Sequence, residues 1–212
     1  MDSMPGLVLF GDVIGSRKDR PGSAAWLRDL VSELDDAYGG QRLAPFGFTQ
    51  GDELQGLLEP PADPLVAVLR AALGPAARPI RWVCIAGPVD PGEGPATQRT
   101  GPAFLSAREA LESARAGHDR LVIRTGRPDA DELLAGMTPA LADLLGDLTA
   151  RQRVVVRLAL IDGLRQSDVA ERLGVRRATI SVSFARARVH TLGRLVVAMR
   201  NVYQLAPIQP EG

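Results

Sequence analysis

The chain has 212 residues, of which 45% are hydrophobic and 24% charged, so it is large and apolar enough to bury a core. This composition excludes an intrinsically disordered chain. No apolar run approaches the roughly 18 residues of a membrane-spanning helix, and no basic segment precedes the short apolar stretch near the start. We therefore expect a cytoplasmic protein with no membrane contact. Its one cysteine, Cys84, excludes an internal disulfide.

A formal net charge of zero hides a division along the sequence. From residue 149 onward there are 11 arginines and four acidic residues, a net charge of +7, so residues 1 to 148 carry a net charge of −7. A basic segment attached to an acidic one is typical of a regulator in which one part binds phosphate groups and the other has a different role.

The first 128 residues alternate between strand and helix patterns. Short apolar runs bounded by turn residues predict strands, and apolar residues at helical spacing predict amphipathic helices. Two strand patterns joined by Gly51-Asp52-Glu53 predict a hairpin. The elements expected in chain order are a strand at 6–11, a helix at 23–38, hairpin strands at 45–50 and 54–58, a helix at 65–73, a strand at 80–86, a helix at 102–116 and a strand at 121–124.

This order of elements predicts the fold class, α+β. A β-α-β-β-α-β order followed by α-β is typical of the ferredoxin-like α/β sandwich, and we expect its helices to pack on one face of a mainly antiparallel sheet. After residue 149 only helices are expected, at 149–161, 166–173 and 177 to about 205. The expected division is an α/β domain at 1–128, a linker helix region at 129–148, and an all-α domain at 149–212.

Residues 166 to 185 fit a helix-turn-helix. Ala170 falls where two helices would cross closely, and Gly174 falls at the turn. The positions expected to be buried hold Val169, Leu173, Val175 and Ile180. The residues then expected to face bases or phosphates in a DNA major groove are Arg176, Arg177, Thr179, Ser181 and Val182, followed by Arg186 and Arg188. The alternative is a solvated basic helix in a helical bundle.

The same region resembles a known family. The sequences LTARQRV at 148–154 and QSDVAERLGV at 166–175 are similar to the region-four helix-turn-helix of sigma factors and of related response regulators. The resemblance implies binding to double-stranded DNA. Val182 departs from the pattern, because such recognition helices often carry a polar or basic residue there, and it is suited to an apolar contact with a thymine methyl group.

An apolar stripe follows the helix-turn-helix and is expected to be buried against another surface. It consists of Leu192, Leu195, Val196, Met199, Val202 and Tyr203. The stripe either packs on its own domain or forms the two-fold interface of a homodimer, in which two readers would double the contacts with DNA.

Two aspartates in the first domain point to a nucleotide site. Asp12 stands where the first strand ends, and Asp52 stands at the hairpin tip beside that strand, so their carboxylates are expected to converge. Mg²⁺ typically binds one or two protein carboxylates together with phosphate oxygens. The residues expected to contact the phosphates are Val13, Ile14, Gly15, Ser16, Arg17 and Arg108. Alternatively, Asp12 caps the loop and Gly51-Asp52 is only a turn.

A second resemblance covers most of the chain. The sequences GDVIGSR at 11–17, TQGDELQGLL at 49–58 and TGPAFLSAREAL at 100–111 resemble the SatD family, including its C-terminal helix-turn-helix. The first two are more distantly similar to the metal motifs of class III nucleotidyl cyclases and GGDEF-type diguanylate cyclases. The resemblance implies a nucleotidyl-cyclase-like domain in which Asp12 and Asp52 bind the metal, helped by the carbonyl of Val13.

The third of these sequences bears on catalysis. In the cyclases a similar helix carries an Asn and an Arg that stabilise the transition state, and aligned on Gly101 these positions hold Leu105 and Glu109. Arg108, one residue away, is a poor substitute because it would point about 100° round the helix. We therefore expect a bacterial DNA-binding transcription regulator that binds a nucleotide such as ATP or GTP, with Mg²⁺, without cyclising it. The alternatives are a nucleotidyl-transfer enzyme with an accessory nucleic-acid-binding domain, and a purely structural interaction domain with a vestigial site.

Overall fold

The computed structural model describes residues 3–49 and 52–205, apart from the side chains of Arg17 and Arg20. The strands are β1 (Met4–Val13), β2 (Arg42–Phe48), β3 (Glu53–Leu58), β4 (Ile80–Val89) and β5 (Leu121–Arg124). The helices are α1 (Arg20–Tyr38), α2 (Pro64–Leu73), α3 (Pro102–Gly117), α4 (Pro128–Gly146), α5 (Ala150–Leu160), α6 (Gln166–Arg172), α7 (Arg177–Arg186) and α8 (Val189–Gln204). Among these described helices, none has both the length and the apolar character needed to cross a bilayer.

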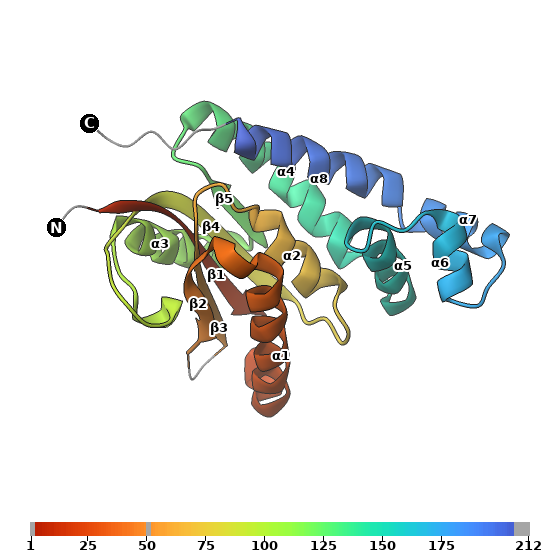
Figure 1. Cartoon of the computed structure of the whole chain (residues 1–212), viewed down its shortest axis with the longest axis horizontal. Helices are drawn as coiled ribbons and strands as arrows, with labels where there is room; N and C mark the ends of the chain where they lie inside the picture. The colour runs from red at the N-terminus through yellow and green to blue at the C-terminus, as the bar shows by residue number, and fades with distance from the viewer. Residues whose placement is uncertain (1–2, 50–51, 206–212) are drawn as a thin grey trace.

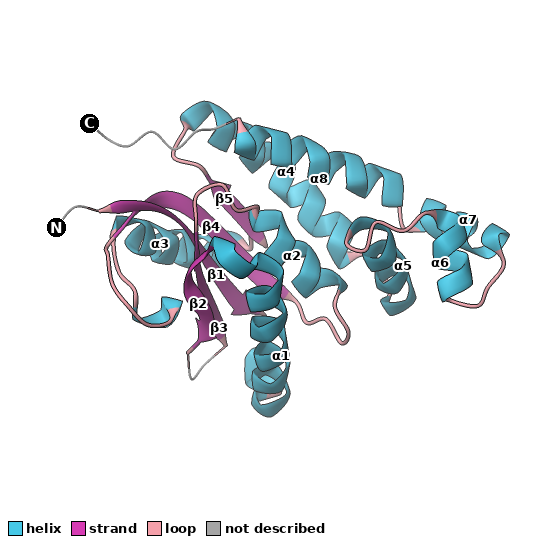
Figure 2. Cartoon of the chain, in the orientation of Figure 1, coloured by secondary structure: helices cyan, strands magenta, loops and turns pink. Residues whose placement is uncertain are grey.

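The sheet confirms the predicted α+β class. Its strand order is β2-β3-β1-β4-β5, in which β1 lies antiparallel between β3 and β4, and β2 pairs antiparallel with β3. The first four strands have the ferredoxin-like order, and β5 adds a parallel strand beside β4. Figures 1 and 2 show the sheet at one end of the molecule and α5, α6 and α7 at the other.

Helices cover both faces of the sheet, so the prediction of a single covered face is wrong. α1 and α2 pack on the face that carries Leu9 and Trp82, whereas α3 packs on the face that carries Phe10 and Val83. The reason lies in β1, where residues 7–10 are all buried. Because successive side chains of a strand point to opposite faces, such a strand needs a cover on each face.

The helices after residue 127 share one hydrophobic core with the side of the sheet that α1 and α2 cover. Most of α4 comes from residues 129–148, the expected linker helix region, and its Leu134 and Leu141 are fully buried. α4 continues through Pro139 and packs against β5 and α8. This segment is therefore part of the packed core.

The single helix expected from residue 177 to about 205 is two helices in the structure, so that prediction is wrong. α7 ends at Arg186, and Arg188 has a left-handed backbone conformation with a φ of 50°. A continuing right-handed helix excludes that conformation. No glycine or proline marks the break, so nothing in the residue pattern signals it.

The apolar stripe of α8 is covered by its own chain. Leu192, Val196 and Met199 are at most 3% exposed and join the shared core, with α4 and α5 packed against α8. Figure 1 shows α8 running back alongside α4. The structure therefore agrees with the first interpretation of the stripe, packing within the chain. The stripe is not free to form a dimer interface.

Candidate functional sites

Helices α5, α6 and α7 form a compact unit at one end of the molecule. Thr149 caps α5 by accepting a hydrogen bond from the amide of Gln152, whose side chain accepts one from the amide of Thr149 in return. α5 packs against both α6 and α7. The recognition helix α7 is thus held from behind by two helices, as a rigid DNA reader requires.

The turn between α6 and α7 has the predicted geometry. Gly174 adopts a positive φ of 62°, and the amide of Val175 donates to the carbonyl of Ala170 at 3.0 Å. Val169 and Ile180 are buried as expected, and Val175 is partly buried. The prediction that Leu173 is buried is wrong, since it is 38% exposed. Leu173 lies just past the last residue of α6, at the rim of a groove between α5 and α7.

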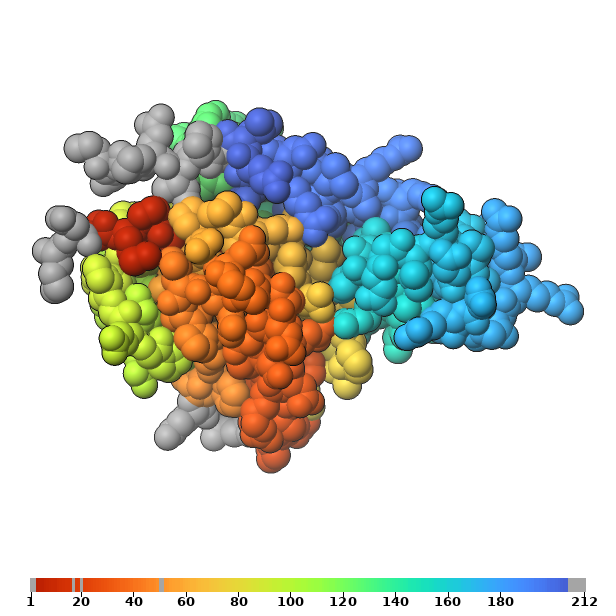
Figure 3. Space-filling model, in the orientation of Figure 1, coloured from red at the N-terminus to blue at the C-terminus, as the bar shows by residue number. Residues whose placement is uncertain are grey.

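The surface of α7 and the residues that flank its two ends carry the predicted DNA-contacting residues. All of them are exposed: Arg176, Arg177, Thr179, Ser181, Val182, Arg186 and Arg188. None of the four arginines forms an ion pair with another residue in the described part of the chain. Figure 3 shows that the segment from about residue 160 to the start of α8 protrudes from the rest of the molecule.

Other arginines in the basic C-terminal segment bind carboxylates on the rest of the chain. Arg157 of α5 pairs with Glu33 of α1 at 2.7 Å, and Arg200 of α8 pairs with Asp63, just before α2, at 2.6 Å. These two pairs fasten the helical segment to the sheet side of the molecule. The arginines of α7 are not used in such pairs among the described residues, so their guanidinium groups are available to bind an anionic partner.

A second charged site lies at the end of β1. The carboxylate of Asp12, 11% exposed, accepts hydrogen bonds from Arg81 of β4 at 2.9 Å and from Arg115 of α3 at 2.7 and 3.2 Å. Arg108 lies 3.4 Å from Glu53 and 5.3 Å from the centre of the Phe10 ring. We call these five charged residues, Asp12, Glu53, Arg81, Arg108 and Arg115, the β1-end cluster.

Asp52 and the loop after β1 lie together, as predicted. The amide of Val13 donates to the carbonyl of Asp52 at 3.1 Å, and the hydroxyl of Ser16 donates to the Asp52 carboxylate. Ile14 is 36% exposed, and Gly15 has a positive φ of 77°. The side chain of Arg17 and the residues Gln50 and Gly51 of the predicted motifs lie outside the described residues.

Arg115 supplies positive charge close to the carboxylates of Asp12, Glu53 and Asp52. Its hydrogen bonds with Asp12 raise the pKa of Arg115 above the usual value, and attraction by Glu53 and Asp52 adds to the rise. Both Asp12 oxygens already accept from arginines, and the Asp52 carboxylate accepts from Ser16. In the described residues no three metal-ligating side chains gather to bind an ion. In this arrangement arginines occupy the position that the prediction gave to a cation, and magnesium binding stays a prediction.

The structure also shows where the residues of α3 that were compared with the cyclase helix lie. Leu105 is 68% exposed and Glu109 is exposed as well, and neither forms an ion pair or a side-chain hydrogen bond with the β1-end cluster in the described residues. Arg108, one of the predicted phosphate contacts, lies beside Glu53 at this end of the sheet. Sequence reasoning missed Arg81 and Arg115. The signals were the spacing of Arg115, seven residues or two helical turns after Arg108, and the alternation that puts Arg81 on one face with Val83.

Comparisons with known proteins bear on the helical end. The sequence profile of sigma-70 region 4 matches residues 139–190, which run from the second half of α4 to the start of α8. None of the curated proteins compared with the chain matches it. Among solved structures, the regulator of polyketide synthase expression from Bifidobacterium adolescentis is similar at 16% identity and a TM-score of 0.28. That alignment covers 95% of this chain and 82% of the other.

The match and the geometry agree on the helical segment. Residues 139–190 contain the brace, the turn and the exposed recognition helix that a helix-turn-helix requires. The chain is therefore an α+β protein that carries a sigma-70 region 4 helix-turn-helix, a DNA-binding module, next to its five-stranded sheet.

Proposed function

We propose that the chain is a bacterial transcription regulator that binds double-stranded DNA through α7. The observation that supports this most is the set of exposed arginines on α7 that lack a carboxylate partner in the described residues. Arginine can donate two hydrogen bonds to guanine or bind backbone phosphates. Arg176 and Arg177 stand at the start of α7, the end that enters the major groove in this class of reader.

Selection of bound sequences from a random duplex library tests this function. We expect repeated rounds with the full chain to enrich one sequence motif, with the Arg176→Ala, Arg177→Ala double variant as the control that fails to enrich it. A motif of two inverted half-sites about one helical turn apart would support the predicted homodimer, and a single half-site would count against it. Recovery of unselected sequences by the parent chain would contradict the proposed function.

We further propose that the α/β part binds a nucleotide, as expected for a SatD-like chain. The support is the β1-end cluster, where the side chains of Arg108 and Arg115 are 54% and 44% exposed and can reach phosphate oxygens. A phosphate group would compete with Asp12 and Glu53 for these guanidinium groups. We expect binding without cyclisation at this site, because the two positions that match the catalytic Asn and Arg of cyclases hold Leu105 and Glu109, which cannot supply an amide or a guanidinium group.

Calorimetry with ATP and GTP, with and without Mg²⁺, tests nucleotide binding. We expect a heat of binding that is lost in Arg115→Gln and kept in Arg124→Gln, an exposed arginine on β5 outside the cluster. Chromatography of the same mixtures should show unchanged nucleotide. Absence of heat with either nucleotide would contradict the proposal, and a cyclic product would favour the enzyme alternative.

A further inference from the structure

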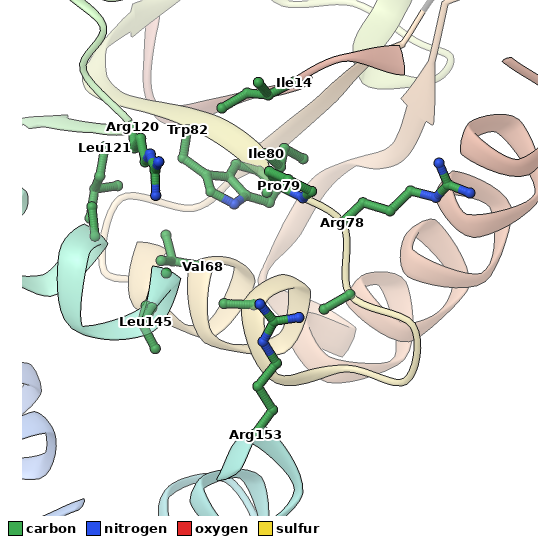
Figure 4. A pocket seen from close by; sticks show the side chains of 14 residues that line it. Ile14, Val68, Arg78, Pro79, Ile80, Trp82, Arg120, Leu121, Leu145 and Arg153 are labelled. Atoms are coloured by element: carbon green, nitrogen blue, oxygen red, sulfur yellow. The ribbon is translucent and has the colours of Figure 1, made fainter. Parts of the chain in front are cut away.

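A cavity of about 270 Å³ lies where the helical segment meets the sheet. One side of it comes from α2, β4 and the start of β5, and the other comes from the end of α4 and the start of α5. We call it the junction cavity. Figure 4 shows the guanidinium groups of Arg120 and Arg153 approaching it from two sides, with the Trp82 indole between them.

The polar side chains of the junction cavity are all hydrogen-bond donors. They are those of Arg78, Trp82, Arg120 and Arg153, and among the described residues no acidic, amide or hydroxyl side chain lines the cavity. Arg78 is neutralised at one edge by Asp19, at 2.6 Å. Arg120 and Arg153 form no ion pair within the described residues. Such a lining attracts a group that carries negative charge and only accepts hydrogen bonds.

Two of these donors are buried and have no partner in the part of the chain that the structure describes. They are the indole nitrogen of Trp82, a residue only 2% exposed, and the Nε of Arg153. Buried donors are normally paired, since an unpaired one loses its bonds to water without replacement. Figure 4 places the indole nitrogen on the side of the ring that faces the cavity. An acceptor inside the cavity would satisfy it.

The rest of the lining is apolar and limits the size of the occupant. Val68, Leu121 and Leu145 contribute aliphatic surface, and the face of the Trp82 ring adds aromatic surface. The volume equals that of about nine water molecules in the liquid. It lies just below the range of roughly 300–1,000 Å³ typical of pockets for drug-sized ligands.

We propose that the junction cavity binds a small organic anion, with an apolar body of about ten non-hydrogen atoms and one carboxylate or phosphate group. The anionic group pairs with Arg120 and Arg153 and accepts from the Trp82 indole, and the apolar body packs against Val68 and Leu145. The site differs from the β1-end cluster. Trp82 lies on the face of the sheet that α2 covers, and Asp12 faces α3 on the other.

Fluorescence of Trp82 provides a direct test on the full chain. The chain has two tryptophans, and Trp26 does not line the junction cavity, so Trp26→Phe leaves Trp82 as the reporter. The probes are small carboxylates and phosphate monoesters, beginning with benzoate and phenyl phosphate. The binding of each anion is compared with that of a neutral relative, for example benzamide in the case of benzoate. We expect at least one anion to change the emission in a saturable way and to bind roughly tenfold or more tightly than its neutral relative.

Variants of the arginines complete the test. Arg120→Gln and Arg153→Gln should each weaken the bound anion roughly tenfold to hundredfold, the effect of losing a charged hydrogen bond. Arg151→Gln is the matched control, because Arg151 lies on the same helix as Arg153 and does not line this cavity. The proposal is overturned if no probe binds, if neutral relatives bind equally, or if all three variants bind like the parent.

Discussion

Asp12 is the most heavily bonded carboxylate at the end of β1. It accepts from Arg81 and Arg115, and both Asp12 and Arg81 are only 11% exposed at the side chain. Removing one partner of a buried pair leaves the other charge uncompensated. We expect Asp12→Asn to lower the free energy of unfolding by about 3 kcal/mol, the lower end for a buried pair because Arg115 is partly solvated.

Urea unfolding measures this loss, and Asp129→Asn is the control. Asp129 pairs with Arg127 at 2.6 Å on the surface, where such pairs contribute about 0–1 kcal/mol. If the two variants lose stability equally, the charge balance that we assign to the β1-end cluster is wrong.

Three buried groups make the fold sensitive to alkali. Burial raises the pKa of Tyr38, Cys84 and Tyr203 above their usual values. The folded chain therefore keeps protons that the unfolded chain releases above about pH 9 to 10. The free energy of unfolding should then fall as the pH rises beyond this range, by up to about 1.4 kcal/mol per pH unit for each group.

Denaturant unfolding at a series of alkaline pH values checks this prediction. Tyr203→Phe removes one titrating group. The free energy of unfolding should then fall less steeply with pH, by the contribution of one proton. A free energy of unfolding that does not change between about pH 8 and pH 11 would contradict it.

At the scale of elements, α8 offers a matched pair of positions. Met199 is fully buried against the rest of the chain, and Val197, two residues earlier, is 54% exposed. Met199→Glu would bury a charge without a partner and should cost more than about 4 kcal/mol, whereas Val197→Glu should change stability by less than about 1 kcal/mol.

Thermal unfolding followed by circular dichroism, with light scattering on the same samples, separates packing from dimerisation. The covered stripe predicts that Met199→Glu lowers the melting temperature. If Met199→Glu instead keeps the parent melting temperature and converts a dimer to monomers, the stripe is an interface between chains.

The order of the elements was predictable because it rests on local patterns. The apolar run before Gly11, the hairpin around Asp52 and the turn at Gly174 each indicate structure within a few residues. The break at Arg188 was not predictable, because its left-handed conformation has no local signal. The position of α3 depended on what covers each sheet face, which is a property of the whole fold.

Some residues of the two candidate sites were predictable from local patterns, and others were not. The exposed residues of α7 follow from helical periodicity, and they lie where the sequence places them. The role of Arg115 requires knowledge of how α3 crosses β1, since 103 residues separate it from Asp12. Long-range ion pairs of this kind are set by tertiary packing, which periodicity alone does not reveal.

At the scale of the whole molecule, the sheet and the C-terminal helices form one cooperative unit. The buried residues of the C-terminal helices and of the sheet face that α1 and α2 cover belong to one cluster that extends from Leu7 to Tyr203, and the hydroxyl of Tyr203 donates to the carbonyl of Pro60. We expect a single unfolding transition, in which the fluorescence of Trp26 and Trp82 and the helical circular dichroism change together. Separate transitions would mean that the two parts fold independently.

Fluorescence anisotropy with the selected duplex tests most directly whether α7 binds duplex DNA. The parent chain is compared at two salt concentrations with Arg176→Ala, Arg177→Ala and with the control Arg28→Ala, Arg124→Ala. The control loses the same charge from exposed arginines on α1 and β5. We predict affinity that falls steeply with salt, and a loss of about 2 kcal/mol or more, roughly thirtyfold, only in the α7 variant. Equal affinity of both variants and the parent at both salt concentrations would contradict the claim.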